Sequence, residues 1–203
     1  MSLYQVLKRL FRLQFRIMRW QVYGEENFPS EGAAILVSNH VSMWDPIVAG
    51  CSVPRNVSFM AKEELFRNPL LGKLFRTLGA FPVKRGRGDT SAIRNSLKVL
   101  RNGQVLGLFP EGTRSKTGDL QKGLPGMILL MEKSKAPIVP VRVNGTKNFL
   151  TRGWGNIEVI IGKPITPDEL KAPAHIKNRR EWAAEKVMEA IHELKPPKKD
   201  NKS

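Results

Sequence analysis

The sequence predicts an α/β fold, a single mixed β-sheet flanked by helices, and two observations support this prediction. Short apolar runs, each bounded by turn residues, alternate with longer segments of helical periodicity, which is the order expected when helices cover a sheet. The 203 residues, of which 41% are hydrophobic, suit one domain with a stable core. Cys51 is the only cysteine, so no internal disulfide can form and a reducing compartment is expected.

Six apolar runs are short enough to be buried strands, namely residues 33–37, 56–61, 81–83, 105–109, 138–143 and 157–161. Pro140 in the fifth run suggests an edge position or a bulge. Helical segments are expected at residues 46–51, 62–66, 69–78, 89–103, after Pro125, and at 178–194. Thr166 and Glu169 have the spacing of a capping box, which predicts a further helix start.

Residues 3–23 contain basic side chains among apolar ones, without proline or glycine, which predicts an amphipathic helix. Five cations fall within an arc of about 100° on a helical projection: Lys8, Arg9, Arg12, Arg16 and Arg19. Charges near the centre of a bilayer cost several kcal/mol each, so a membrane-spanning helix is disfavoured. A wide apolar face beside a narrow basic stripe is typical of a helix in the membrane interface, and packing against the protein core is the alternative.

This segment sets the expected domain organisation. Residues 1–24 are expected to form a membrane-association helix, residues 25–195 the α/β domain, and residues 196–203 a disordered basic tail. No small-residue cleavage site follows a short apolar core, so a cleavable signal peptide is not expected.

The formal net charge of +16 implies an anionic partner, which is a membrane surface, a nucleic acid, or an acidic protein or substrate. The sequence has no zinc-finger spacing and no aromatic-and-glycine signature of an RNA-binding sheet, so nucleic-acid binding is supported by charge alone. The three histidines and the single cysteine are scattered along the chain, and no metal site is expected.

The first concentration of reactive side chains follows the first predicted strand and reads SNHVSMWDP over residues 38–46. A neutral imidazole accepts a proton from a hydroxyl when a carboxylate holds its other nitrogen in the right tautomer. His40 and Asp45 are therefore candidates for a general-base dyad. The alternative is that Asp45 caps the helix starting at Pro46 and that His40 is an unrelated loop residue. A lone His-x4-Asp motif does not decide between them.

Two further predicted strands end in cationic loops. One loop reads KRGRG over residues 84–88 and is either an anion-binding loop or a solvated turn. The other reads PEGTRS over residues 110–115. In it Arg114 can bind phosphate, Glu111 can accept a hydrogen bond from a hydroxyl, and Gly112 allows close backbone approach. Reactive groups of α/β sheets gather beyond the strand ends, so all three groups are expected on one rim, which favours the dyad.

Four blocks of the sequence resemble, in the same order, those of the glycerolipid acyltransferases, the family of 1-acyl-sn-glycerol-3-phosphate acyltransferases. They are NHVSMWDP at residues 39–46, FPVKR at 81–85, FPEGTRS at 109–115 and IVPV at 138–141. Together they cover roughly residues 33 to 145. Lys84 stands where the family's second block is expected to carry an acidic residue, whereas Arg85 matches the block.

The resemblance implies a direct acyl transfer, in which His40 deprotonates the free hydroxyl of lysophosphatidic acid and Asp45 orients the imidazole. Acyl-CoA or acyl-carrier protein would be the donor and phosphatidic acid the product. No cofactor or metal is implied, because the thioester is already activated. Ser42 as an acyl-enzyme nucleophile is a competing mechanism, although no Gly-x-Ser-x-Gly elbow is present. Glycerol-3-phosphate or another lysophospholipid is the alternative acceptor.

The resemblance also implies the residues of the acceptor site. Arg85 and Arg114 would bind the acceptor phosphate, with Lys62 as an addition, while Glu111 and Gly112 would shape the glycerol site. Since the acceptor and product are lipids, a site held at the membrane interface would reach them laterally. The implied location is the cytoplasmic side of the cell membrane, with the protein peripheral or monotopic on anionic lipid and without a nucleic-acid partner.

Overall fold

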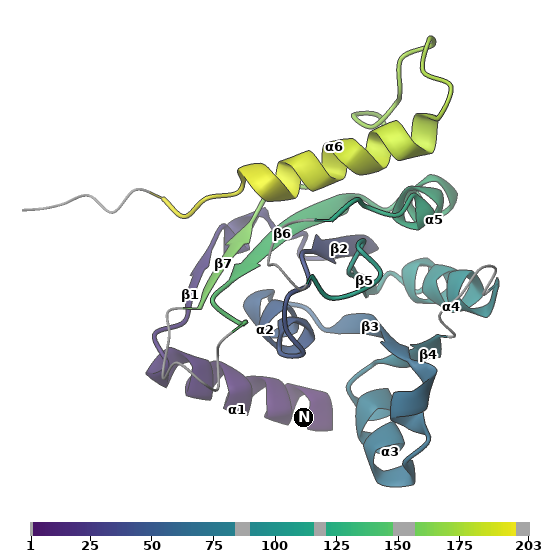
Figure 1. Cartoon of the computed structure of the whole chain (residues 1–203). Helices are drawn as coiled ribbons and strands as arrows, with labels where there is room; N and C mark the ends of the chain where they lie inside the picture. Colours follow the sequence, from purple (N-terminus) through teal and green to yellow (C-terminus); the bar gives the residue numbers. More distant parts are fainter. Residues whose placement is uncertain (1, 84–89, 116–120, 148–156, 198–203) are drawn as a thin grey trace, which may run out of the picture.

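A computed structural model describes residues 2–83, 90–115, 121–147 and 157–197 (Figure 1). Within these ranges, seven strands form one sheet in the order β1-β7-β6-β2-β5-β3-β4. Neighbouring strands are parallel except β6 and β7, which are antiparallel, so the predicted mixed sheet is confirmed. The strands are β1 (Gln21–Tyr23), β2 (Ala34–Ser38), β3 (Val57–Lys62), β4 (Phe81–Val83), β5 (Val105–Leu108), β6 (Ile138–Asn144) and β7 (Glu158–Ile161).

Helices cover both faces of the sheet, as predicted. They are α1 (Leu3–Ile17), α2 (Asp45–Ser52), α3 (Pro69–Thr77), α4 (Thr90–Arg101), α5 (Gly126–Ser134) and α6 (Arg179–Glu193), with short 3-10 turns η1 (Glu25–Asn27) and η2 (Glu63–Phe66). The central strand β2 shows why both faces need cover, since all five of its residues are buried. Ala34 and Leu36 pack in the cluster shared with α1 and α2, whereas Ile35 and Val37 pack in the cluster shared with α4, α5 and α6.

The register of the central strands places two predicted loops side by side. In the parallel pair β2–β5, Val37 lies opposite Leu108. The chain therefore leaves both strands at the same edge of the sheet, His40 following β2 and Glu111 following β5. Strand β3 is the next neighbour of β5 and ends at the same edge.

The predicted N-terminal helix is shorter than expected. It ends at Ile17, and residues Gln21–Tyr23 form strand β1, which pairs in parallel with β7. The backbone of Arg19 has a φ of 55° and turns the chain out of the helix. Hydrogen bonds to a distant strand outweigh local helix propensity here, because an unpaired edge of β7 would leave backbone groups unsatisfied. In the part of the chain described, no helix has the length and apolar character needed to cross a bilayer.

Two local predictions are corrected by tertiary contacts. Thr166 does not begin a helix; its amide and hydroxyl donate to the Glu169 carboxylate in a turn, and the next helix starts only at Arg179. Pro173 restricts the residue before it to extended backbone, which leaves too few residues for a helix there. Pro140 lies on an interior strand and not at an edge. Between the pairs Ile138–Ile165 and Val141–Ile161, the partner segment has one residue more than β6, which is the spacing of a bulge.

Candidate active site

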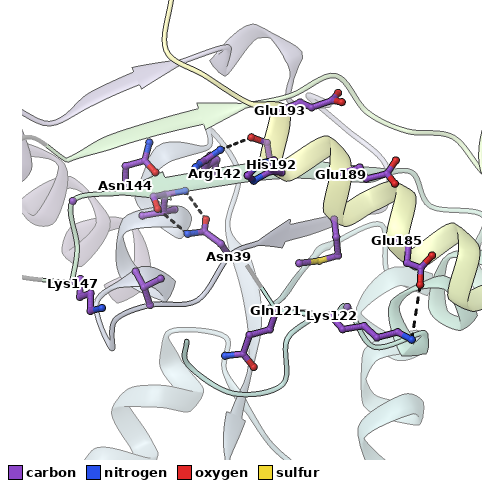
Figure 2. Close-up of a pocket in the computed structure, with 15 residues that line it drawn as sticks. Asn39, Gln121, Lys122, Arg142, Asn144, Lys147, Glu185, Glu189, His192 and Glu193 are labelled. Atoms are coloured by element: carbon purple, nitrogen blue, oxygen red, sulfur yellow. Dashed lines mark hydrogen bonds and ion pairs between the residues drawn. The ribbon is translucent and has the colours of Figure 1, made fainter. Parts of the chain in front are cut away.

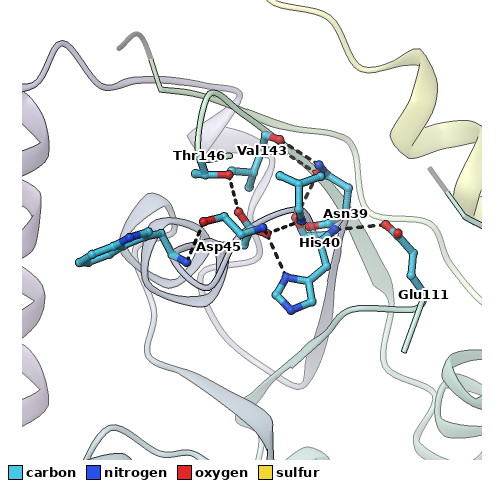
Figure 3. Close-up of polar contacts among 10 residues, drawn as sticks. Asn39, His40, Asp45, Glu111, Val143 and Thr146 are labelled. Carbon is cyan, nitrogen blue, oxygen red and sulfur yellow. Dashed lines mark hydrogen bonds and ion pairs between the residues drawn. The ribbon is translucent and has the colours of Figure 1, made fainter. Parts of the chain in front are cut away.

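The imidazole of His40 and the carboxylate of Asp45 meet at the carboxyl end of β2 (Figure 3). Nδ1 of His40 lies 2.9 Å from Oδ2 of Asp45. Asp45 is the first residue of α2, and the loop of residues 40–44 folds back so that the two side chains face each other. Of the two interpretations of this motif, the structure therefore shows the His–Asp pair.

Asp45 is completely buried, and donors from two parts of the chain satisfy its carboxylate. Oδ2 accepts from the amides of Val41 at 2.6 Å and Ser42 at 2.7 Å, in addition to the His40 contact. Oδ1 accepts from the Thr146 hydroxyl at 2.5 Å. A buried carboxylate is tolerated when its oxygens are hydrogen-bonded in this way. The expectation that Asp45 caps the helix is wrong, because Trp44 is the N-cap residue and the carboxylate turns to the preceding loop.

These contacts define the protonation pattern of His40. Because the carboxylate of Asp45 is an acceptor, the hydrogen on the imidazole is assigned to Nδ1, which leaves the lone pair on Nε2. The His40 side chain is 12% exposed, so solvent or a substrate has limited access to the ring. An imidazole in this tautomer, with its partner carboxylate held in place, is arranged to accept a proton at Nε2.

The His40 ring rests on an aromatic stack at the end of β5. Its centroid is 4.2 Å from that of Phe109, and Phe109 is 5.7 Å from Phe59 on β3. Gly107 makes room for this stack, since a Cβ at that position would lie 2.3 Å from the Phe59 ring. The sequence analysis did not single out Gly107 or the two phenylalanines. A glycine inside an apolar strand is nonetheless a signal for close approach of another group.

Glu111 links the second loop to the dyad. Its Oε1 accepts from the His40 amide at 3.1 Å, and the Ser115 amide donates to the His40 carbonyl at 2.8 Å. Glu111 is buried, with 7% of its surface exposed. Burial raises the pKa of Glu111 above its ordinary value, and the hydrogen bond from the His40 amide opposes that rise. The two loops that the sequence predicted on one rim are therefore in direct contact.

The remaining predicted binding residues are Gly112, Arg114, Lys62 and Arg85. Gly112 has a φ of 69°, a left-handed conformation that favours glycine, and is followed by the exposed Arg114. Lys62 ends β3 and its ammonium pairs with Glu64 at 3.0 Å on the exposed surface. Arg85, with Lys84, lies outside the described residues, so its predicted phosphate contact stays a prediction.

Two residues that the sequence analysis did not assign a role fasten the His40 loop to β6. The side chain of Asn39 accepts from the Val143 amide at 2.8 Å and donates to the Val143 carbonyl at 2.9 Å. Thr146, just after β6, holds Asp45 as described above. Both residues are buried. Neither contact is visible in the sequence, because 104 positions separate Asn39 from Val143 and 101 separate Asp45 from Thr146.

A cleft of about 790 Å³ lies between the His40 loop, β6 and α6 (Figure 2). Asn39 and Val41 form one wall, β6 forms the floor, and the exposed carboxylates of α6 form the opposite wall. Asn39 and Val41, the chain neighbours of His40, line the cleft, whereas His40 itself does not. In the described ranges, no group of three or more His, Cys, Asp and Glu side chains is placed to hold a metal ion.

A largely parallel sheet with a His–Asp pair at its carboxyl edge is the arrangement of an α/β protein whose functional site lies beyond the strand ends. A family model described as Acyltransferase matches residues 19–144, more than half of the chain. The chain belongs to this family, and the protein is an acyltransferase.

Individual relatives agree with this assignment. A 1-acyl-sn-glycerol-3-phosphate acyltransferase of Bacillus subtilis is 32% identical over 181 residues, which cover 86% of this chain and 87% of the relative. A chloroplastic enzyme of the same name from Arabidopsis thaliana is 33% identical over 153 residues, covering 71% of this chain but only 43% of the relative. The crystal structure of the 1-acyl-sn-glycerophosphate acyltransferase from Thermotoga maritima matches with a TM-score of 0.74 at 26% identity, covering 94% of this chain and 78% of that one.

Proposed function

We propose that the protein transfers a fatty acyl group from acyl-CoA or acyl-carrier protein to the sn-2 hydroxyl of lysophosphatidic acid, giving phosphatidic acid for phospholipid biosynthesis. The observation that carries the proposal is the His40–Asp45 pair, with 2.9 Å between Nδ1 and Oδ2 and a fully buried carboxylate. The names of the relatives from Bacillus subtilis and Arabidopsis thaliana support the choice of acceptor.

In the proposed reaction, Nε2 of His40 accepts the proton of the acceptor hydroxyl while the hydroxyl oxygen attacks the thioester carbonyl. A C–O bond forms and the C–S bond breaks. The proton then passes from Nε2 to the departing thiolate, so the imidazole returns to its neutral form. Asp45 stabilises the imidazolium that exists between the two proton transfers. Atoms and charge balance with these groups alone, and we therefore propose that no cofactor or metal takes part.

The acceptor phosphate is proposed to bind to Arg114, Arg85 and Lys62. Arg114 is exposed in the loop whose Glu111 contacts the His40 amide, which supports a role near the acceptor. Arg85 and Lys62 are proposed to complete the phosphate site, and Glu111 and Gly112 to shape the glycerol site. A planar guanidinium can bind phosphate through two parallel hydrogen bonds, whereas an ammonium acts as a compact charge without that fixed geometry.

Helix α1 is proposed to hold the enzyme on anionic lipid at the cytoplasmic face of the cell membrane. Its exposed side includes Leu3, Leu10, Leu13 and Ile17, which are 51–64% exposed. The basic stripe is narrower than expected, since Lys8 donates to the Arg55 carbonyl at 2.7 Å instead of facing outward. Burial lowers the pKa of Lys8 to about 8. Arg12 is half-buried and pairs with Glu25 at 3.2 Å. The exposed leucines beside the exposed Arg9, Arg16 and Arg19 support interfacial binding.

The proposal is tested by incubating the purified protein with an acyl-CoA and lysophosphatidic acid, and measuring released thiol and phosphatidic acid. We expect turnover in the wild type and a loss of at least about 10²-fold in His40→Ala, the effect of removing a general base. His175→Ala is the matched control, because His175 is exposed and lies in a loop away from the dyad. Retained turnover in His40→Ala would refute the base assignment.

The same assay separates the alternatives. Faster turnover with glycerol-3-phosphate or another lysophospholipid would identify that compound as the acceptor, with the same acyl-transfer reaction. Acyl-carrier protein in place of acyl-CoA identifies the donor. A nucleic-acid-binding module would instead show no acyl transfer, and salt-sensitive binding to DNA or RNA that is indifferent to His40→Ala.

A further inference from the structure

The exposed apolar side chains are concentrated in a few elements. Among the residues that the structure describes, ten large apolar side chains are exposed, and all ten belong to α1, to η2 and α3, or to two loops at the candidate active site. They are Leu3, Leu10, Leu13, Ile17, Met43, Leu65, Leu70, Leu71, Leu74 and Leu124. The helices α4, α5 and α6 contribute none of these ten. Surface leucines scattered singly are ordinary, whereas a set confined to one region indicates a contact surface.

Helix α3 presents the most exposed of these residues. Leu70 is 80% exposed, and Leu71 and Leu74 lie on the same side of the helix. Asn68 caps α3 by accepting from the amides of Leu70 and Leu71 at 3.0 and 3.1 Å, which stabilises the start of the helix. Leu71 and Leu74 are 47% and 38% exposed.

The opposite side of α3 explains why the leucines face outward. Phe75 packs on Phe66 of η2, with 5.9 Å between ring centroids. Gly72 lies so close to η2 that a Cβ there would be 2.8 Å from the Phe66 carbonyl oxygen. Helix α3 is thus anchored through one side, and the leucine side remains exposed.

The charges around these leucines identify the chemistry of a partner. Element η2 begins with the exposed Glu63 and Glu64, of which Glu64 pairs with Lys62 at 3.0 Å. The residues that follow, 65–78, contain Arg67, Lys73 and Arg76 and no aspartate or glutamate. All three cations are exposed, and the Arg76 guanidinium lies 5.2 Å from the Phe66 ring centroid. Leucines flanked by cations fit an anionic lipid surface, where the leucines enter the headgroup boundary and the cations meet phosphates.

The position of α3 agrees with this partner. Strand β3 leads through η2 into α3, and β3 pairs with β5, so α3 begins at the sheet edge that carries the dyad. In Figure 1, α1 and α3 lie together along the bottom of the view, while α6 crosses the top. A membrane that contacts both helices would therefore lie beside the edge from which a lipid acceptor reaches His40.

We infer that the leucine side of η2 and α3 is a second membrane-contact surface, which seats on anionic lipid together with α1. A second copy of the chain is a poorer occupant. The face of a nine-residue helix offers much less than the ~800 Å² per partner of a stable interface. Self-association would also bring three cations against three cations. The inference extends the proposed membrane association but does not depend on the proposed acyl acceptor.

The test places an environment-sensitive fluorophore on α3 through Leu70→Cys. The native thiol of Cys51 is buried and its pKa is raised by burial to about 11, so it stays protonated and unreactive during labelling. Mock labelling of the wild type checks this. Leu13→Cys on α1 and Glu189→Cys on α6 are labelled in the same way as comparison sites. Vesicles contain phosphatidylglycerol, and a second set carries nitroxide groups on the acyl chains.

We expect the label at position 70 to shift to shorter wavelength on anionic vesicles and to be quenched by the acyl-chain nitroxides, as at position 13. The label at position 189 should do neither. A response at position 13 with none at position 70 would overturn the inference. A shift at position 70 that rises with protein concentration without vesicles would also overturn it, in favour of a second copy.

An unlabelled variant checks the energetics. Leu70→Asp combined with Leu74→Asp should weaken binding to phosphatidylglycerol vesicles by at least about tenfold, because apolar burial is lost and like charges are introduced. Both positions are exposed, so the fold should be unaffected, which circular dichroism checks. Unchanged vesicle binding by this variant would contradict the inference whether or not the wild type acylates lysophosphatidic acid.

Discussion

Substituting Thr146 by valine removes the hydroxyl that donates to Asp45 Oδ1 at 2.5 Å while keeping the shape of the side chain. Thr146 is 1% exposed and Asp45 is fully buried, so no water replaces the lost donor at low cost. A hydrogen bond to a charged group contributes about 1.5–3 kcal/mol. We take about 2 kcal/mol here, since Asp45 keeps its other donors. For a chain of this size that loss lowers Tm by about 4–8 °C.

Removing the Thr146 hydroxyl should also lower the rate of acyl transfer. With Oδ1 unanchored, the Asp45 carboxylate holds the His40 imidazole less firmly, and about 1.4 kcal/mol lost in the transition state lowers kcat tenfold. The KM for the acyl acceptor should stay unchanged, because Thr146 lies on the buried side of Asp45, behind the imidazole. Thermal unfolding by circular dichroism and steady-state thiol release measure the two effects.

Two variants make this prediction refutable. Thr146→Ser keeps the hydroxyl and should restore most of kcat. Thr166→Val is the matched control, because Thr166 donates to the Glu169 carboxylate at 2.6 Å but both groups are exposed. Its effect on stability should be within about 0.5 kcal/mol. If Thr146→Val had the Tm and kcat of the wild type, the Thr146 hydrogen bond would not position Asp45.

Three further predictions concern the surroundings of the dyad. The free energy of unfolding of Glu111→Gln should rise relative to that of the wild type between pH 4 and pH 8. The raised pKa of Glu111 means that the folded wild type holds the carboxyl proton more tightly than the unfolded chain does. The wild type therefore loses stability as the pH rises above 4.5, the ordinary pKa of the side chain, whereas a glutamine does not titrate. Denaturant unfolding of both proteins at pH 4 and pH 8 checks this. If the difference in free energy of unfolding between variant and wild type were the same at both pH values, the prediction would be wrong. Gly107→Ala should cost about 1–3 kcal/mol by crowding Phe59, and the second change Phe59→Leu should recover part of the loss in Tm; a Gly107→Ala protein with native Tm would refute the packing argument. Ser42→Ala should retain turnover within about threefold, since the base mechanism gives Ser42 no covalent role, and abolished turnover with an intact fold would favour the acyl-enzyme alternative.

Local patterns in the sequence were sufficient to predict most strands, whereas the His–Asp pair was favoured only when the three strand-end loops were considered together and compared with the family's blocks. Strand β2 is recognisable because five apolar residues run without a break between turn residues, as expected of a strand buried on both faces. His40 and Asp45 are five positions apart, so one loop and one helix start decide their geometry. The Glu111 loop could be placed beside them because parallel neighbouring strands end at the same edge.

Long-range pairing accounts for what the sequence did not predict. Residues Gln21–Tyr23 fit a helical pattern when considered alone, but β7 offers them a ladder of backbone hydrogen bonds. The inward turn of Lys8 depends on the Arg55 carbonyl, 47 positions away. Thr146 could not be linked to Asp45, because only the placement of β6 beside β2 brings them together.

Asp45 begins α2 without capping it, and its position at the helix start still helps to form the His–Asp pair. A helix start offers positive potential, and Asp45 at the first position of α2 benefits from it without capping any amide of the helix. Its carboxylate is then free to accept from the Val41 and Ser42 amides, which fold the loop back over it. That fold brings Nδ1 of His40 to the same oxygen. The spacing of five residues is thus the length of loop that lets one buried carboxylate organise both its own turn and the imidazole.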